Sequence, residues 1–342
     1  MHNHSFFIQK CLNLALKGFP HNSPNPMVGS IIVYNGKIIG KGYHEKYGSY
    51  HAEVNAINSV KDLKLLKRST LYVNLEPCAH VGKTPPCSDL IIKHKIPKVV
   101  IGCLDTFSEV SGRGIAKMKK EGIEVICGVL ERESRELNKR FFTFHEKKRP
   151  YIILKWAESK DRFIAPKNQK KPFWITSSQS KKLVHKWRNE EDAILIGRTT
   201  AEKDNPLLTV RDVNGKNPIR IIIDSKLKLK SHLNIFNNDS ETIIINSLKD
   251  DIESNIKFMK LNFNNSIENI LNKLHESKIQ SVIIEGGSKT LKSFIDRKIW
   301  DEARIFTAKK ILYKGLYAPK IHGKVISNKK IKEDMLKIIV NA

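Results

Sequence analysis

Four side chains in the first hundred residues have the types needed for hydrolysis at a metal ion: His51, Glu53, Cys78 and Cys87. One imidazole and two thiolates give Zn²⁺ three protein ligands and leave the fourth position for water. Zinc in such an open site lowers the pKa of its water to about 7, so hydroxide forms at neutral pH. Glu53 can take the proton of that water and pass it to a departing amine. The pattern matches that of zinc deaminases, in which H-x-E is followed by P-C and a second Cys, although eight residues rather than the usual two separate Cys78 and Cys87.

Two segments of the second half have residues suited to a phosphorylated cofactor. Residues 283–288 read as a buried strand that runs into two glycines at a helix start, where free N–H groups bind anions. Residues 199–211 read as a polar loop between strands that ends in the cation Arg211. No G-x-G-x-x-G follows a strand here, so a Rossmann site is not expected.

The first half predicts an α/β domain that positions the metal ligands at element ends. Asn35-Gly36 is a strong hairpin turn, and the sheet after this hairpin is expected to be mostly parallel. His51 and Cys87 then open helices, and Cys78 follows a strand. The expected strands are 28–34, 37–43, 70–75, 98–103 and 123–127, and the expected helices are 5–17, 51–60, 87–94, 115–121 and one long helix at 131–145.

A charge run at residues 146–150, which ends in proline, predicts the domain boundary. We expect one domain at 1–147 and a second, also α/β, at 150–342. The Asn- and Lys-rich stretches 228–240 and 247–265 are expected to be loops. The expected strands of the second half are 151–156, 192–196, 218–223, 241–245, 281–284 and 302–307, and its expected helices are 177–189, 267–277 and 288–298.

The composition is that of a globular protein, with 40% apolar and 28% charged residues and a net charge of +26. The 48 Lys are scattered and far outnumber the 13 Arg, which indicates a solvated surface rather than a nucleic-acid footprint. A positive surface still favours small anionic substrates. No apolar run is long enough to span a bilayer, and residues 1–4 lack a secretory pattern, so we expect a cytoplasmic protein without membrane contact.

The five cysteines do not suggest a disulfide framework, because their number is odd and the chain reads as cytosolic. Cys11, Cys103 and Cys127 lie in apolar or helical patterns and are expected to be small buried hydrophobes. Cys78 and Cys87 remain as the metal-binding pair.

Residues 77–87, together with 24–29, 42–44 and 51–54, closely resemble the RibD family of bifunctional riboflavin-biosynthesis deaminase/reductases. The resemblance implies a cytidine-deaminase-like N-terminal domain in which His51, Cys78 and Cys87 hold zinc and Glu53 is the acid/base. It also implies that Asn25, His44, His80 and Lys83 contact the substrate. An Asn can read a pyrimidine edge, and Lys and His suit a phosphoribosyl anion.

The resemblance extends to the second half, which looks like the family's reductase domain with a dihydrofolate-reductase-like fold. The matched positions imply an NADPH site lined by Ala157, Trp174, Thr200, Asp204, Ser225, Gly287, Ser288, Lys289, Thr290, Leu291, Lys292 and Ser293. They imply substrate contacts from Lys155, Arg188, Leu208, Arg211 and Glu285.

Four departures from the family pattern are visible. Arg162 stands at a glycine position, where it can alter a tight turn. Pro172 replaces a substrate-contacting Ser, and residues 105–108 differ from the usual Asp-Pro-Asn-Pro beside the deaminase pocket. Residues 336–342 look too short for the family's final strand. A deaminase with a weakened reductase half is therefore one alternative.

The resemblance implies two consecutive steps toward riboflavin. Zinc-dependent deamination of 2,5-diamino-6-(5-phosphoribosylamino)pyrimidin-4(3H)-one is followed by NADPH reduction of the ribosyl chain to ribityl phosphate. We expect one Zn²⁺ per chain, NADPH, a phosphoribosylated pyrimidine as partner and a homo-oligomer. Two further alternatives are a nucleic-acid-editing deaminase, favoured only by the charge, and a structural zinc site with a fourth protein ligand.

Overall fold

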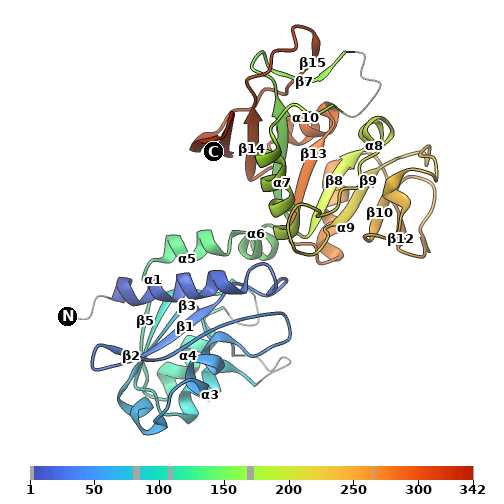
Figure 1. Cartoon of the computed structure of the whole chain (residues 1–342). Helices are drawn as coiled ribbons and strands as arrows, with labels where there is room; N and C mark the ends of the chain where they lie inside the picture. Colours follow the sequence, from blue (N-terminus) through green and yellow to red (C-terminus); the bar gives the residue numbers. More distant parts are fainter. Residues whose placement is uncertain (1–3, 80–84, 107–110, 168–172, 265, 342) are drawn as a thin grey trace. The chain divides into compact units, whose positions relative to one another are not determined.

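The chain forms two compact units, Met1–Lys147 and Lys148–Ala342, in a computed structural model (Figure 1). The structure describes residues 4–79, 85–106, 111–167, 173–264 and 266–341. No helix in these ranges combines the length and the apolar character that crossing a membrane requires.

The N-terminal unit is a five-stranded sheet in the order β2-β1-β3-β4-β5. Its first three strands pair antiparallel, and β3, β4 and β5 run parallel. The strands are β1 Gly29–Tyr34, β2 Lys37–Tyr43, β3 Thr70–Leu75, β4 Lys98–Cys103 and β5 Glu124–Cys127. The helices are α1 His4–Ala15, α2 Ala52–Asn58, α3 Cys87–Lys93, α4 Arg113–Lys120, α5 Glu131–Leu137 and α6 Lys139–Lys147.

Both faces of this sheet are covered, which explains why the inner strands β1, β3 and β4 are buried at nearly every position. Alternate side chains of a strand point to opposite faces. Leu71 and Val73 pack with residues of α2, α3 and α4, whereas Tyr72 between them packs with α1. The unit is therefore a three-layer α/β/α sandwich, which positions the ends of β3, α2 and α3 together.

The C-terminal unit has a ten-stranded sheet in the order β11-β12-β10-β9-β8-β13-β6-β14-β17-β16. The seven strands from β12 to β14 in this order are parallel, and antiparallel strands close both edges. They are β6 Tyr151–Glu158, β8 Ala193–Gly197, β9 Ile219–Ile223, β10 Thr242–Asn246, β11 Asp251–Glu253, β12 Ile256–Lys260, β13 Ser281–Gly286, β14 Glu302–Thr307, β16 Lys324–Ile331 and β17 Asp334–Val340. A separate two-stranded sheet pairs β7 Phe163–Pro166 with β15 Gly315–Tyr317.

Helices cover both faces of the large sheet. They are α7 Ser178–Glu190, α8 Arg198–Asp204, α9 Ser266–Glu276 and α10 Ser288–Asp296. Apolar side chains of α9 and α10 join the largest core, and Val184 and Trp187 of α7 join a second core against Ile153 and Phe306. This arrangement places α8 and α10 directly after the carboxyl ends of β8 and β13, where ligands bind in parallel sheets.

The expected long helix at 131–145 is wrong, because Asn138 interrupts it between α5 and α6. The Asn138 amide accepts a hydrogen bond from the Met27 backbone N–H at 2.7 Å and donates one to the Met27 carbonyl at 2.9 Å. Met27 is 111 residues away from Asn138 in the chain, and these two hydrogen bonds hold Asn138 at the break between α5 and α6. Cys127 is also not buried as expected, because β5 is the edge of the sheet.

Two expected loops of the second half are corrected. The polar loop at 199–211 contains helix α8, and the loop at 247–265 contains β11 and β12, where Met259 is buried. The final strand is present as β17, which pairs with β14 through six residues. The Arg162 turn also forms: Arg162 has a φ of 67° and its N–H donates to the Ser159 carbonyl at 2.9 Å. Pro172 lies outside the described residues.

Candidate functional site

The structure brings His51, Cys78 and Cys87 together, with their ligand atoms within 4.8 Å of one another. His51 precedes α2, Cys78 follows β3 and Cys87 is the first residue of α3. The His51 Nδ1 atom lies 3.5 Å from Cys78 Sγ and 3.3 Å from Cys87 Sγ. Tetrahedral zinc with ordinary Zn–N and Zn–S bonds separates nitrogen and sulfur by about 3.5 Å. The donor set and its spacing therefore fit zinc, with three ligands among the described residues.

The environment of the two cysteines favours ionisation of Cys78 over Cys87. Hydrogen bonds from Cys87 and from the His51 ring hold the pKa of Cys78 well below its usual range, although burial opposes them. The neighbouring Cys78 sulfur and burial raise the pKa of Cys87. The Cys78 thiol therefore ionises first, and the Cys87 backbone N–H also donates to its sulfur at 3.3 Å. A thiolate is the form that binds metal.

Glu53 lies in the first turn of α2, next to His51, and is only 3% exposed. Burial raises its pKa to about 7, although His51 acts in the opposite direction. A carboxyl group with a pKa near neutrality can both accept and release a proton at physiological pH. Glu53 thus has the position and the proton affinity of a general acid/base.

Asn25 and His44 extend the metal cluster. The rings of His44 and His51 meet edge to face at 5.5 Å, and the Asn25 amide nitrogen lies 3.0 Å from His44 Nε2. His44 Nδ1 lies 3.0 Å from the carbonyl oxygen of Tyr50, which can only accept a hydrogen bond. Nδ1 therefore carries the proton, and Nε2 accepts from Asn25. Burial lowers the pKa of His44 and keeps the ring neutral. His80 and Lys83 lie outside the described residues.

Glu76 supports this site and was missed in the sequence. Its buried carboxylate accepts hydrogen bonds from the backbone N–H groups of Asp105, Gly112, Gly114 and Ile115, at 3.0–3.3 Å. Two residues later the chain reaches Cys78, so the carboxylate ties the metal-ligand loop to the start of α4. The position of this carboxylate, between an apolar strand and Pro77-Cys78, was the sequence feature that could have indicated its supporting role.

The predicted substrate residues of the C-terminal unit meet in an ion-pair network. Glu285 on β13 accepts a hydrogen bond from Arg188 of α7 at 2.9 Å and lies 3.8 Å from Lys155 Nζ of β6. Burial opposes ionisation of Glu285, but the two cations outweigh it and hold its pKa at about 2. Burial lowers the pKa of Lys155, against the attraction of Glu285. The Glu285 Oε1 and Arg188 Nε atoms are buried without a hydrogen-bond partner, as in a site built for a polar ligand.

Leu208 and Arg211 lie on the segment that passes beside Arg188. The Arg188 guanidinium donates to the Thr209 carbonyl at 3.2 Å, and the Arg211 guanidinium donates to the Thr209 hydroxyl at 3.2 Å. Leu208 is buried and has a φ of 55°, an uncommon backbone conformation for leucine. Contacts therefore connect four of the five predicted reductase substrate residues, whereas the Leu208 side chain packs in an apolar core with Ile196 and Ala201.

Three of the predicted NADPH-site residues, Thr200, Gly287 and Thr290, lie just after the carboxyl ends of β8 and β13. A Cβ atom on Gly287 would lie 3.0 Å from Thr200 Oγ1, and one on Gly197 would lie 2.7 Å from Thr290 Oγ1. Glycine at these two positions therefore makes room for the threonine side chains. The start of α10 beside them is a helix N-terminus, where backbone N–H groups can bind a phosphate. Ser288 opens α10, and Asp204 ends α8.

The other predicted cofactor residues differ in exposure. Ser225 follows β9, Ala157 is half-buried on β6, and Trp174 is 61% exposed, with Lys181 5.3 Å from its ring centre. Within α10, Leu291 is buried in the core, Lys292 pairs with Asp296, and Ser293 donates to the carbonyl of the exposed Lys289. The first turn of α10 is therefore better placed for a ligand than residues 291–293.

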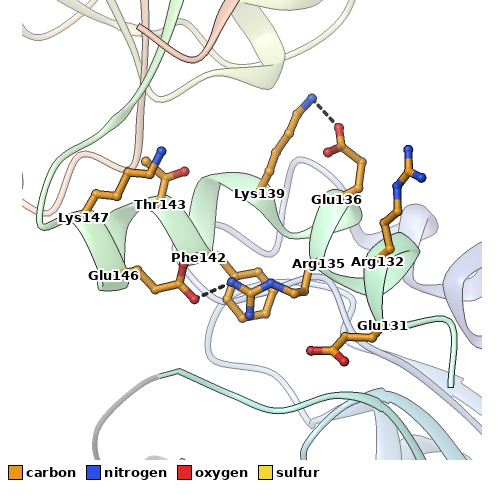
Figure 2. A pocket seen from close by; sticks show the side chains of 9 residues that line it. All are labelled: Glu131, Arg132, Arg135, Glu136, Lys139, Phe142, Thr143, Glu146 and Lys147. Carbon is orange, nitrogen blue, oxygen red and sulfur yellow. Dashed lines mark hydrogen bonds and ion pairs between the residues drawn. The ribbon is translucent and has the colours of Figure 1, made fainter. Parts of the chain in front are cut away.

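A separate hollow lies along α5 and α6 and includes none of the predicted site residues (Figure 2). Its charges are largely paired with one another: Arg135 with Glu146 and Lys139 with Glu136. It is lined by Glu131, Arg132, Arg135, Glu136, Lys139, Phe142, Thr143, Glu146 and Lys147.

Comparison with known proteins places these two sites in a family. The model for the cytidine and deoxycytidylate deaminase zinc-binding region matches residues 1–103, and that for the RibD C-terminal domain matches residues 150–324. The riboflavin biosynthesis protein RibD of Aquifex aeolicus is 42% identical over 318 residues, which cover 91% of this chain and 88% of that protein. The chain belongs to the RibD family.

Solved structures agree with this assignment over the full length. A deaminase/reductase from Thermotoga maritima is 38% identical, with a TM-score of 0.90 and coverage of 100% of this chain and 99% of that chain. RibD of Acinetobacter baumannii is 27% identical, with a TM-score of 0.90 and 99% coverage of both chains. This RibD-family chain is thus a bifunctional riboflavin-biosynthesis enzyme with a zinc-binding deaminase domain and an NADPH-using, dihydrofolate-reductase-like domain.

Proposed function

We propose that this chain converts 2,5-diamino-6-(5-phosphoribosylamino)pyrimidin-4(3H)-one to 5-amino-6-(5-phosphoribosylamino)uracil and then reduces the ribosyl chain to ribityl phosphate. The observation that carries the proposal is the His51, Cys78 and Cys87 cluster with the buried Glu53 beside it. The Thermotoga maritima relative is described as a deaminase and reductase of these phosphoribosylated pyrimidines.

In the deaminase step, His51, Cys78 and Cys87 would hold zinc, which when bound activates water for attack on the amine-bearing ring carbon. Glu53 receives a proton from the water and delivers one to the departing ammonia, since its pKa of about 7 suits both transfers. Asn25, fixed by the neutral His44 ring, orients the pyrimidine. We assign His80 and Lys83 to the phosphoribosyl group on the motif match.

In the reductase step, bound NADPH supplies the hydride for C1′ of the ribose. Lys155, Arg188 and Arg211 provide cationic N–H donors for the phosphorylated sugar, and Glu285 balances the first two. Leu208 shapes the same region. The chain's main contribution is to hold the sugar carbon close to the cofactor, which converts a bimolecular encounter into an oriented reaction.

For the cofactor we assign the residues around β8 and β13, with Gly287, Ser288 and Thr290 nearest to the helix start. Ala157, Trp174, Thr200, Asp204 and Ser225, together with Lys289, Leu291, Lys292 and Ser293, complete the assignment from the motif match. The paired β17 strand and the formed Arg162 turn support an intact reductase rather than a weakened one.

We also propose that the chain works in the cytoplasm, because reducing conditions keep Cys78 and Cys87 available as metal ligands. A small phosphorylated substrate, rather than nucleic acid, suits its scattered lysines, and light scattering will test the expected homo-oligomer.

A time course with the purified chain and the diamino substrate tests the proposed function. Without NADPH, one ammonia per substrate should form with no further change. With NADPH, its oxidation should follow ammonia with a lag. Ammonia release that needs NADPH, or NADPH oxidation that precedes ammonia, would contradict the proposed order of steps.

A further inference from the structure

One face of α7 contacts residues 209–212, the segment that carries Arg211. Lys181, His185 and Arg188 are spaced by four and three residues, so they lie on the same side of the helix. Arg188 donates to the Thr209 carbonyl, and Lys181 lies 3.6 Å from the Asp212 carboxylate. His185, between them, contacts the part of the segment that includes the Arg211 backbone.

The contacts of His185 are directional. The Arg211 backbone N–H donates to His185 Nδ1 at 3.1 Å, so this nitrogen has no proton and the proton of the neutral ring is on Nε2. Nε2 lies 3.7 Å from Asp212 Oδ2. The histidine is 1% exposed, so its orientation is fixed by burial as well as by these two contacts.

We propose that His185 is a positioning residue of the reductase reaction, which fixes the Arg211 backbone and so presents the Arg211 guanidinium to the phosphorylated sugar. The inference rests on the proposed function, in which Arg211 contacts that substrate. Arg211 itself is exposed and has five N–H donors, of which one is used by the Thr209 hydroxyl. An exposed cation on a fixed backbone is a preorganised anion ligand.

The rest of the segment is fixed in the same way. The Val210 N–H donates to the Asn217 side chain at 2.8 Å, and Arg188 links the Thr209 carbonyl to Glu285 on β13. The backbone contact at Arg211 is therefore the one supplied by His185. Loss of this single acceptor would free the residue that meets the substrate while leaving its neighbours fixed.

The surroundings of His185 favour an acceptor over a cation. Burial lowers its pKa to about 4, and Arg188, Arg211 and Lys181 act in the same direction, against Asp212. The ring therefore stays neutral at physiological pH and keeps its Nδ1 lone pair for Arg211. A purely apolar side chain of similar size would fill the space but would leave that N–H without a partner.

Two substitutions of His185 distinguish its role as a hydrogen-bond acceptor for the Arg211 N–H from its role in packing. In His185→Asn the side-chain oxygen takes the place of Nδ1, whereas His185→Leu removes the acceptor. For the deaminated substrate with NADPH, we expect the Leu variant to raise KM about tenfold, the size expected from one lost hydrogen bond. The Asn variant should stay within about twofold of the native enzyme, and the KM for NADPH should not change in either.

An unchanged KM in His185→Leu, or equal increases in both variants, would overturn the proposal, because packing alone would then explain the residue. If the Leu variant no longer binds NADPH, His185→Gln replaces it. Its amide reaches the Nε2 position but not the Arg211 N–H, so it should raise KM while His185→Asn does not. Equal KM values for the Asn and Gln variants would equally overturn the proposal.

The Arg211→Ala variant distinguishes a failure of the Arg211 substrate contact from a failure of the His185 positioning role. A native KM in Arg211→Ala would contradict the assigned substrate contact and, with it, the proposed function of this residue. A raised KM in Arg211→Ala combined with native values in all His185 variants would contradict only the positioning role.

Discussion

Glu53 and Glu285 are both buried carboxylates, one in each unit, and their neighbours give them opposite properties. Burial raises the pKa of Glu53 to about 7. His51 lowers this pKa and the Cys78 sulfur raises it, so the neighbouring charges act in opposite directions. Burial opposes the ionisation of Glu285 too, but Arg188 and Lys155 hold its pKa at about 2. Glu53 can therefore carry a proton at neutral pH, whereas Glu285 remains a fixed anion.

The two sites also differ in how they are assembled. The metal ligands and Glu53 come from residues 51–87 of one compact motif. The reductase residues come from β6, α7, β13 and the segment after α8, and they meet only when the parallel sheet has formed. We therefore expect metal loss to affect one activity and charge removal the other.

The largest effect should come from removal of zinc. Dialysis against a strong chelator should abolish ammonia release, because His51, Cys78 and Cys87 lose the ion that activates water. NADPH oxidation with the deaminated substrate should keep its native rate, and added Zn²⁺ should restore ammonia release. Ammonia release by chelated, metal-free protein would contradict the metal assignment.

Glu285→Gln should be the most damaging change to the second unit. It leaves Lys155 and Arg188 buried without their anion, which costs roughly 3–5 kcal/mol of stability when a buried pair is broken. Reductase activity and the unfolding midpoint of this unit should both fall, whereas ammonia release should not change.

The matched control for that change is the double variant Lys155→Met/Glu285→Gln. Removal of one cation with the anion should recover part of the stability without the activity. If the single variant unfolds like the native chain, the ion pairs do not hold this site together.

Asn138→Ala tests the support of the first unit. The substitution leaves the Met27 N–H without its acceptor, whereas the Met27 carbonyl still accepts from the Asn74 side chain at 3.0 Å. We therefore expect a loss of about 1–3 kcal/mol, measured by urea inactivation of ammonia release. Ser49→Ala is the control, because the Ser49 hydroxyl in the same unit likewise accepts from the N–H of one residue, Lys46, and donates to its carbonyl, but in exposed hydrogen bonds. Equal, small losses in both variants would show that the buried Asn138–Met27 pair does not stabilise the first unit.

The smallest expected effect is on the pH dependence of folding stability in the second unit. The pKa of His185 is lowered to about 4 in the fold by burial and by Arg188, Arg211 and Lys181, against Asp212. The unfolded chain therefore binds a proton below about pH 6.5 that the folded chain refuses until about pH 4, so stability falls as the pH falls across this window.

His185→Asn lacks this titration. Between pH 6.5 and pH 4.5 the native enzyme should lose a few degrees more in Tm of the reductase unit than this variant, by calorimetry. Parallel curves for the two proteins would show that the His185 environment does not resist protonation.

The sequence was most informative where local chemistry decides the structure. The Asn35-Gly36 turn and the candidate metal ligands depend on residue types at short spacing. The hairpin and the convergence of His51, Cys78 and Cys87 are confirmed. The break at Asn138 could not be predicted, because its partner Met27 is 111 residues away.

Long-range pairing explains the other errors. The sequence 251–260 is too polar for a buried strand, but Ile256–Lys260 pairs parallel to β10, between β10 and the edge strand β11. Glu76 looked like one more polar residue, because its four backbone donors come from residues 105–115, on the far side of a helix and a strand. The individual roles of the reductase residues remain predictions from the motif match.

The most direct test of the account is Glu53→Gln, which keeps the size of the side chain and removes its proton chemistry. Zinc content, ammonia release and NADPH oxidation are measured on one preparation. We predict one zinc per chain, ammonia release reduced by about 10²–10⁴-fold, and native NADPH oxidation with the deaminated substrate. Ammonia release at the native rate with zinc in place would contradict the central claim that Glu53 moves the protons.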